Sequence, residues 1–300
     1  MPALNQQHIK KMKSNALFLR MLWALLVLGS IQATAQDRFG GVTLYTLRGE
    51  MGQHPMETLQ AVADLGYKFI EAAGYQDGKY YGLAPEEFKK AVQDLGMEPL
   101  STHQASITLD NADKEFADAK AAGFKYFVIP VPPMGHFTYN RETQSLAMSE
   151  DLDVLVDIFT QLANKANKAG LTLLYHNHNF EFETNSKGQV PYDYFLEHMD
   201  PKLMNFQIDL YWATKAGVDP VAYFEKYPGR FKIWHMKDMD DQGRFAPVGT
   251  GSIDFAKLLE SKEKAGMEFY VVEQDQTFDG MRPLESAAIS HQGLKKAGYK

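Results

Sequence analysis

A glycine that ends a helix-like segment and leads straight into an apolar run recurs along this chain. The pattern occurs at Gly66, Gly96, Gly123, Gly170 and Gly266. Glycine just beyond a helix end adopts the left-handed conformation without the steric cost that a Cβ atom would impose. A short connection from a helix into the next strand is typical of repeated β/α units. The repeat therefore predicts an α/β protein with a parallel sheet.

Apolar runs and the helix-like segments between them give eight predicted units. The strands are expected at Gly41–Leu47, Lys68–Ala72, Glu98–His103, Tyr126–Val131, Leu171–His178, Met204–Leu210, Phe231–His235 and Phe269–Glu273. The helices are expected near Pro55–Leu65, Ala84–Leu95, Asn111–Ala122, Ser149–Ala169, Pro191–His198, Pro220–Lys226, Asp254–Ala265 and Arg282–Ala297. No linker rich in Gly, Ser or Pro divides them, which predicts a single (β/α)8 TIM barrel. An open doubly wound sheet would need a glycine-rich phosphate loop after the first strand, and Thr46–Gly52 is not one.

The last four predicted strands each end on a side chain that can bind a metal. These side chains are His176 and His178 on one strand and Asp209, His235 and Glu273 on the next three. Alternate residues of a strand share a face, so both histidines of the first pair should point the same way. The carboxyl ends of barrel strands form one rim, where TIM-barrel active sites lie. We therefore expect a metal site at this rim.

The nature of these ligands limits the ion without choosing one. The chain contains no cysteine, so disulfides, thiolate metal sites and cysteine nucleophiles are excluded. Imidazole and carboxylate ligands suit a divalent ion such as Mn²⁺, Mg²⁺, Co²⁺ or Zn²⁺. Such an ion can polarise a carbonyl group as a Lewis acid. The alternative is that these polar residues are structural, since a strand histidine or an acid at a strand end is often just that.

Further polar side chains are expected at the same rim. Glu71 ends the second predicted strand and His103 the third, while Lys237 shares the face of His235. Gln207 shares the face of Asp209. A lysine beside a metal and a carboxylate can act as a proton donor or stabilise an oxyanion, although it can equally form a structural ion pair. Because they end neighbouring strands at the same rim, Glu71 and His103 are also candidate catalytic residues.

The first residues of the chain resemble an export signal. Four basic residues, Lys10, Lys11, Lys13 and Arg20, precede an apolar run at Met21–Leu28, and Ala33-Thr-Ala35 has the small residues of a cleavage site. The apolar run is short for a transmembrane helix, which is the alternative. We predict a signal peptide over residues 1–35, with cleavage after Ala35 and a periplasmic or secreted product.

The charge of the chain bears on its partners. The formal net charge is −7, and removal of the four basic residues of the predicted signal peptide would make it −11. An acidic protein gives no reason to expect binding to nucleic acid or to an anionic membrane. We expect a small-molecule partner, and the sequence does not determine an oligomeric state.

Five segments together resemble the xylose-isomerase-like TIM barrels, often described as sugar phosphate isomerases/epimerases. They are Tyr175-His-Asn-His-Asn-Phe-Glu-Phe182, Gln207-Ile-Asp-Leu-Tyr-Trp212, His235-Met-Lys-Asp238, Val248-Gly-Thr-Gly-Ser-Ile-Asp-Phe255 and Val272-Glu-Gln-Asp275. The last of these, together with His235-Met-Lys-Asp238, is most similar to the inosose dehydratase branch. The resemblance covers essentially the whole chain after the predicted signal peptide.

The resemblance implies a divalent ion held by Glu, Asp, His and Glu from strands five to eight. Asp209, His235 and Glu273 match the last three places, whereas His176 stands where the family has its first acid. An additional imidazole favours a later transition metal over Mg²⁺. Family epimerases move a proton with two carboxylates; Glu273 matches one, and Glu181 is the candidate for the other.

The resemblance implies a metal-dependent isomerase or epimerase acting on a sugar or keto-sugar by proton abstraction next to a carbonyl. The base would be Glu273, Glu181 or His103, and Lys237 could donate to the enediolate. A lyase that eliminates water or an aglycone from a keto-sugar or 3-keto-glycoside is the alternative, since both reactions begin with the same proton transfer. Two further alternatives are a metal-dependent phosphodiesterase similar to DNA-repair endonucleases and an inert barrel that binds carbohydrate. The acidic charge and predicted export disfavour the phosphodiesterase.

Overall fold

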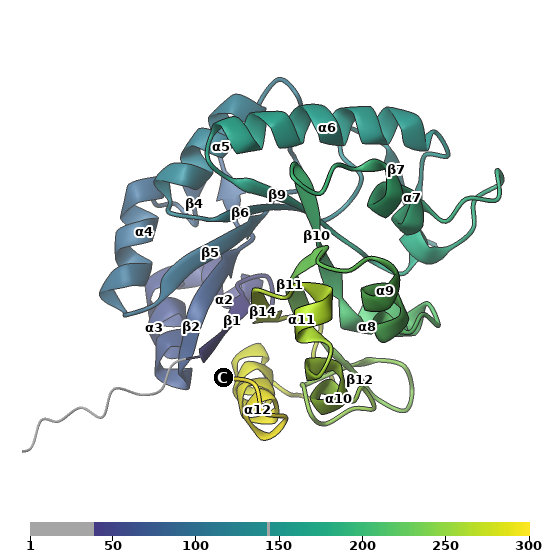
Figure 1. Cartoon of the computed structure of the whole chain (residues 1–300). Coiled ribbons are helices and arrows are strands. Elements are labelled where there is room, and N and C mark those ends of the chain that lie inside the picture. Colours follow the sequence, from purple (N-terminus) through teal and green to yellow (C-terminus); the bar gives the residue numbers. More distant parts are fainter. Residues whose placement is uncertain (1–38, 143–144) are drawn as a thin grey trace, which may run out of the picture. The chain divides into compact units, whose positions relative to one another are not determined.

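Eight parallel strands close into a barrel in the computed structural model, which describes residues 39–142 and 145–300 (Figure 1). The strands are β1 (Phe39–Thr43), β2 (Tyr67–Ala72), β5 (Glu98–His103), β6 (Tyr126–Ile129), β9 (Thr172–His176), β10 (Met204–Asp209), β11 (Phe231–Met236) and β14 (Phe269–Val272). They follow one another around the barrel in chain order, and β1 closes it by pairing with both β2 and β14. The predicted (β/α)8 barrel is confirmed.

Helices surround the barrel and alternate with its strands, as Figure 1 shows for the long α6 over β6 and β9. Their bounds are α2 (Arg48–Gln53), α3 (Pro55–Leu65), α4 (Pro85–Asp94), α5 (Ala112–Ala121), α6 (Leu152–Lys168), α7 (Pro191–His198), α8 (Leu210–Lys215), α9 (Pro220–Lys226), α10 (Phe255–Leu259), α11 (Lys262–Ala265) and α12 (Pro283–Lys296). The expected glycine caps are present. Gly66 after α3 has φ 95° and Gly266 after α11 has φ 76°, both left-handed.

Several details differ from the expected elements. The helix expected at Asp254–Ala265 is two short helices, α10 and α11. Two short helices, α2 and α8, were not expected, and neither were three hairpins that follow barrel strands. The hairpins are β3 (Tyr75–Gln76) with β4 (Lys79–Tyr80), β7 (Phe137–Asn140) with β8 (Ser145–Met148), and β12 (Asp238–Met239) with β13 (Phe245–Ala246). These additions lie in connections that follow strands, which in a TIM barrel build the active-site face.

The interior of the barrel changes from apolar to polar along the strands. One group of buried residues, Leu100, Tyr126, Val128, Leu174, Ile233 and Val271, packs as a separate apolar cluster. Because side chains alternate with a period of two, the residues that follow on the same face are His176 after Leu174, His235 after Ile233 and Glu273 after Val271. The pleat therefore places these polar side chains directly above the apolar layer.

The predicted signal peptide at residues 1–35 lies outside the residues that the structure describes. Within residues 39–142 and 145–300, no helix is long and apolar enough to cross a membrane. The predicted cleavage after Ala35 and the export of the protein stay predictions.

Candidate metal and catalytic site

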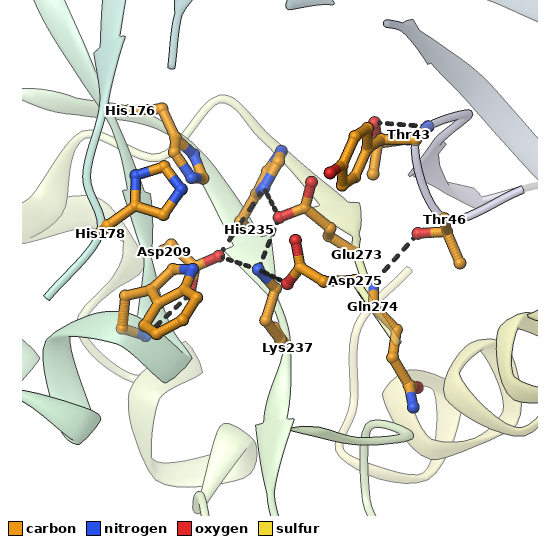
Figure 2. A network of polar contacts seen from close by, with 12 residues as sticks. Thr43, Thr46, His176, His178, Asp209, His235, Lys237, Glu273, Gln274 and Asp275 are labelled. Atoms are coloured by element: carbon orange, nitrogen blue, oxygen red, sulfur yellow. Dashed lines mark hydrogen bonds and ion pairs between the residues drawn. The ribbon is translucent and has the colours of Figure 1, made fainter. Parts of the chain in front are cut away.

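Four side chains from four consecutive strands converge at the carboxyl end of the barrel (Figure 2). His176 ends β9, Asp209 ends β10, His235 lies in β11 and Glu273 directly follows β14. Each offers one ligand atom, and these atoms lie within 4.8 Å of one another. All four residues are buried. Two imidazoles and two carboxylates form a donor set for a divalent transition metal, and we call them the ligand group.

Asp209 supplies the test of whether an ion fits this group. Its Oδ1 accepts a hydrogen bond of 2.9 Å from the backbone N–H of Trp212, at the start of α8. Its Oδ2 is buried and accepts no hydrogen bond from the described residues. Burial raises the pKa of Asp209 to about 6, although the nearby Lys237 opposes that rise. Its Oδ2 faces the Lys237 ammonium at 3.0 Å, but Lys237 shares its single charge with Glu273 and Asp275, so the buried acids keep negative charge that a divalent ion would balance.

Lys237 provides a positive charge beside the ligand group. Its ammonium lies 3.0 Å from Asp209 Oδ2, 2.7 Å from Glu273 Oε2 and 2.6 Å from Asp275 Oδ2. Burial by itself would lower the pKa of Lys237, but the three carboxylates outweigh it and hold that pKa well above its usual value. Lys237 is therefore a buried cation that partly neutralises the acids.

The positive charges nearby also determine whether Glu273 is ionised. Burial acts to raise the pKa of Glu273, but Lys237 and His235 hold it well below the usual range. Its Oε2 faces His235 Nδ1 at 3.1 Å as well as the lysine ammonium. Glu273 is therefore an ionised carboxylate, the form that binds metal.

Glu71 lies on the opposite side of the His235 ring from Glu273. Its Oε1 is 2.7 Å from His235 Nε2, and its Oε2 accepts hydrogen bonds of 2.7 Å from both Ser101 and Gln207. Although burial opposes it, His103 and His235 lower the pKa of Glu71 to about 2. The two flanking acids overcome burial in turn and raise the pKa of His235 to about 10. Glu71 is fully buried and does not line the cavity described below, so it contacts the site through His235.

His103 joins the ligand group through a shared amide. Its Nε2 lies 2.6 Å from Gln207 Oε1, and His176 Nδ1 lies 3.0 Å from the same oxygen. His103 is itself within 4.8 Å, by one ligand atom, of His176 and His235. It is partly exposed where the ligand histidines are buried. The structure thus brings His103 to the rim, as expected from its strand end.

His178 lies beside the ligand group but not in it. Its ring centroid is 5.1 Å from that of His176, and it stacks on Phe180. The strand was expected to run to residue 178, but β9 ends at His176 and the chain turns into a 3₁₀ helix at Phe180–Phe182. Strand alternation therefore does not carry His178 into the ligand set. Burial, assisted by Lys237, lowers the pKa of His178 to about 3, so it is neutral.

Glu181 is turned away from the ligand group. Its Oε1 accepts a hydrogen bond of 2.8 Å from Tyr175 Oη, and its Oε2 accepts one of 2.8 Å from the backbone N–H of His178. Burial raises the pKa of Glu181 to about 8. The turn after β9 points this carboxyl back to its own strand, where it holds His178 in place. Glu181 is neither in the cavity wall nor in the ligand group.

A cavity of about 270 Å³ opens beside the ligand group. Its wall is formed by Tyr45, Ala73, His103, Ala105, Pro130, Val131, His176, His178, Glu273 and Asp275. This volume is near the lower end of small-molecule sites, which begin at about 300 Å³. A larger cavity of about 360 Å³ near Arg244 and Phe278 contains none of the ligand group, so the chemistry favours the smaller one.

Asp275 is the residue of this site that the sequence reasoning missed. It pairs with Lys237, lines the cavity and is 25% exposed in its side chain. It lies two residues after Glu273, and that spacing is the signal that could have found it. Lys237, in contrast, is fully buried and absent from the cavity wall. Of the two, Asp275 is therefore the residue that a molecule in the cavity can contact.

The family model described as xylose isomerase-like TIM barrel matches residues 59–284. The chain belongs to this family. The sequence resemblance is thereby confirmed. Among curated proteins, an inosose dehydratase of Geobacillus thermodenitrificans is 23% identical over 254 residues, covering 74% of this chain and 84% of that protein.

Solved structures of the family share the barrel. A sugar phosphate isomerase/epimerase from Parabacteroides distasonis superposes with a TM-score of 0.74 at 26% identity, covering 90% of this chain and 97% of that one. The IOLI protein, solved with a zinc atom, has a TM-score of 0.64 at 14% identity and covers 85% and 96%. A Mycobacterium smegmatis protein solved with magnesium has a TM-score of 0.62 at 14% identity and covers 87% and 96%. The latter two likenesses show the fold alone.

Proposed function

We propose that this chain is a metal-dependent enzyme that removes a proton next to the carbonyl of a keto-sugar or a related cyclic keto-polyol. The observation that carries the proposal is the ligand group at the edge of a cavity of about 270 Å³. Polar groups that converge on a pocket at the carboxyl end of a TIM barrel are the usual arrangement of an active site.

His176, Asp209, His235 and Glu273 would hold the ion. When bound, a divalent ion supplies Lewis acidity to the substrate carbonyl and so acidifies the neighbouring C–H. Two imidazoles favour Mn²⁺, Co²⁺ or Zn²⁺ over Mg²⁺. The zinc and magnesium of the two structural neighbours support a divalent ion without distinguishing between these metals.

His103 is the base that we favour. It lines the cavity and is the rim histidine outside the ligand group with a hydrogen bond to Gln207 that orients its ring. General-base catalysis of this kind requires a proton acceptor within reach of the substrate C–H. Lys237 and Asp275 supply balancing charge on the other side, and Asp275 is exposed to the cavity. Lys237 acts through Asp275 and Glu273, because its ammonium is fully buried.

Elimination is the outcome that the positions of the acids favour. The sequence put isomerisation or epimerisation first, with Glu273 and Glu181 as two carboxylates. Glu181 is instead bonded to Tyr175 and to the backbone of His178. One base suffices for a lyase: His103 takes the proton from carbon, the C–H electrons form the double bond, the C–O bond to the neighbouring carbon breaks, and the departing oxygen receives the proton from the His103 imidazolium. The inosose dehydratase relatives support this carbon–oxygen lyase. The similarity to the sugar phosphate isomerase/epimerase from Parabacteroides distasonis supports the isomerase/epimerase alternative.

The cavity wall supports an unphosphorylated substrate. Its residues include two acids and three histidines but no lysine or arginine. Phosphate binding in proteins relies on cationic side chains or on exposed backbone amides at a helix start. A free or oxidised sugar also agrees with the predicted export of the protein, since sugar phosphates are mostly intracellular.

The test combines metal analysis with turnover in D₂O. We expect about one divalent ion per chain, and chelator-sensitive conversion of a keto-glucoside or of a keto-inositol. A hydroxy-enone, or the 1,2-diketone to which it tautomerises, as product supports the lyase. A product with inverted configuration and one solvent deuteron supports the isomerase/epimerase alternative instead. Absence of bound metal, deuterium exchange and product from the folded protein would favour the inert carbohydrate-binding barrel.

The phosphodiesterase alternative has less support. Within the described ranges, the two groups that could hold a metal share His176 and His235, so they describe one centre and not a multi-zinc cluster. The net charge of −7 also disfavours a DNA substrate.

A further inference from the structure

The buried carboxylate of Glu71 and the buried amide of Gln207 together contact three histidines. These are His176 and His235 of the ligand group and the neighbouring His103. Glu71 contacts His235 at 2.7 Å and His103 at 3.6 Å, and it also accepts from Gln207. Gln207 contacts both His103 and His176. The two residues are fully buried, and neither belongs to the ligand group. Their arrangement decides which nitrogen of each ring carries a proton.

The orientation of the Gln207 amide follows from Glu71. Glu71 Oε2 lies 2.7 Å from Gln207 Nε2 and accepts a second hydrogen bond from Ser101 Oγ. An ionised carboxylate only accepts hydrogen bonds, so the group facing it must be the amide NH₂. A flipped amide would place two oxygens 2.7 Å apart inside the barrel. Gln207 Oε1 must therefore face the other way, toward His103 and His176.

Gln207 Oε1 in turn determines which nitrogen carries the hydrogen in the imidazoles of His103 and His176. A carbonyl oxygen has two lone pairs and can accept two hydrogen bonds. His103 Nε2 lies 2.6 Å and His176 Nδ1 3.0 Å from it, so each of these nitrogens must carry the hydrogen. The lone pairs of the neutral rings then lie on His176 Nε2 and His103 Nδ1. A metal binds only a nitrogen that carries no proton.

Glu71 contacts the His235 ring directly and determines which of its nitrogens is available to an ion. The Nε2 of His235 donates to Glu71 Oε1, so this nitrogen keeps its hydrogen. Its Nδ1 faces Glu273 Oε2 at 3.1 Å and Asp209 Oδ2 at 3.9 Å, the two acids of the ligand group. Nδ1 is thus the nitrogen available to an ion. A carboxylate that holds the second N–H of a metal-binding histidine is a known means of fixing the tautomer and raising the basicity of the ligand.

We propose that Glu71 and Gln207 are positioning residues that determine, for three histidines, which ring nitrogen faces the metal or the substrate. Through them, His176 presents Nε2 and His235 presents Nδ1 as metal ligands, while His103 presents Nδ1 as a proton acceptor. This assigns Glu71 a role that acts through other residues and not the catalytic role expected from its strand end. The inference rests on the metal site of the proposed function.

The tautomers are measured directly by long-range ¹H–¹⁵N NMR on metal-free protein labelled with ¹⁵N in histidine. In the wild type we expect hydrogen on Nδ1 of His176 and on Nε2 of His103. Hydrogen on Nε2 of His176 would overturn the proposal. This spectrum requires no turnover, so it can fail or succeed independently of whether the protein is a lyase.

A variant and a matched control extend the test. In Gln207→Leu, which removes the shared amide at similar volume, we expect the preference of His176 for Nδ1–H to be lost. We also expect Zn²⁺ affinity, measured by calorimetry on the folded protein, to fall by about 10- to 100-fold. The control is Ser101→Ala, which removes another hydrogen bond to the same Glu71 oxygen but contacts no histidine. Unchanged tautomers and Zn²⁺ affinity in Gln207→Leu, or equal losses in Ser101→Ala, would contradict the proposal.

Discussion

Glu71 and Glu273 bind opposite nitrogens of the His235 imidazole, at 2.7 Å from Nε2 and 3.1 Å from Nδ1. The three residues come from β2, from the end of β14 and from β11, and all are buried. A histidine between two buried acids is charged in the metal-free site, which explains why its pKa is raised to about 10 despite burial. An ion at the ligand group would take the place of the Nδ1 proton.

Replacing His235 by Ala should remove metal binding and also weaken the metal-free fold. The substitution leaves Glu71 and Glu273 without the cation between them, and breaking a buried ion pair from one side costs about 3–5 kcal/mol. We expect no detectable Zn²⁺ binding by calorimetry and a lower urea midpoint. The control is His198→Ala, because His198 is exposed, and its ring bonds the backbone carbonyl of Tyr194 and stacks on the ring of that residue, with no acid paired with it in the described residues. Full stability of H235A would show that the two acids need no cation.

Lys237→Met should make the stability of the protein depend on added metal. The substitution leaves Asp209, Glu273 and Asp275 without their shared ammonium, at a cost of about 3–5 kcal/mol. A divalent ion at the ligand group restores positive charge, so Mn²⁺ or Zn²⁺ should raise the Tm of K237M more than that of the wild type.

The control for this prediction is Lys226→Met. Lys226 also pairs with two acids, Asp193 and Glu197, but its side chain is 51% exposed. An exposed pair contributes about 1 kcal/mol or less. K226M should therefore resemble the wild type with and without metal. An equal metal response in K237M and K226M would show that Lys237 does not balance the charge of the ligand group.

Glu181→Gln should keep most of the activity, whereas Glu273→Gln should not. Glutamine at residue 181 can still accept from the His178 N–H and bond to Tyr175, so the turn after β9 survives. Glu273→Gln replaces an ionised ligand of the proposed metal site by a neutral amide, so metal binding and turnover should both be lost. Turnover of E181Q within a few-fold of the wild type would assign Glu181 a structural role. A loss comparable to that of E273Q would restore the two-carboxylate epimerase mechanism.

Glu115, on the outer helix α5, gives a pH dependence that is separate from the site. Burial raises the pKa of this carboxyl to about 7, and its Oε2 accepts no hydrogen bond from the described residues. Because the folded-state pKa lies above the unfolded value, folding favours the protonated acid. The contribution of Glu115 to stability is therefore present at low pH and is lost as the pH rises through about 7.

Glu115→Gln removes this dependence. We expect the variant to be more stable than the wild type by about 1–2 kcal/mol at about pH 8 and nearly equal to it at about pH 4, as measured by urea unfolding. Partial solvation of the carboxyl keeps this difference small. The control Glu86→Gln changes an exposed acid in the first turn of α4 and should show no such pH difference. A stability gain in E115Q that is equal at both pH values would rule out titration of Glu115 as its cause.

The predicted signal peptide is tested by mass spectrometry of the protein exported from a bacterial host. We expect a chain that begins at Gln36. Replacing Ala35, the last small residue before the predicted cleavage site, by a bulky Tyr should leave the precursor uncleaved. Recovery of the full-length chain in the cell, in both the wild type and A35Y, would contradict the prediction.

Local sequence patterns were enough to predict the barrel and the rim positions of four strand-end side chains, although they also predicted His178 as a ligand. Glycine after a helix and a period of two along a strand are local properties, and they placed His176, Asp209, His235 and Glu273 on one face. A residue at the carboxyl end of a parallel strand must lie at the same rim as its counterparts, whatever the loops do.

The surroundings of those ligands depend on long-range contacts that the sequence does not reveal. His178 and Glu181 follow the end of β9, where the chain turns into a 3₁₀ helix and strand alternation no longer applies. Glu71 contacts His235 across 164 residues of sequence, and Gln207 contacts His103 across 104. Such contacts depend on barrel closure and on the register between strands, which no local pattern in the chain specifies. The hydrogen-bond partner of each imidazole, and so the nitrogen that it presents, is therefore a property of the closed barrel.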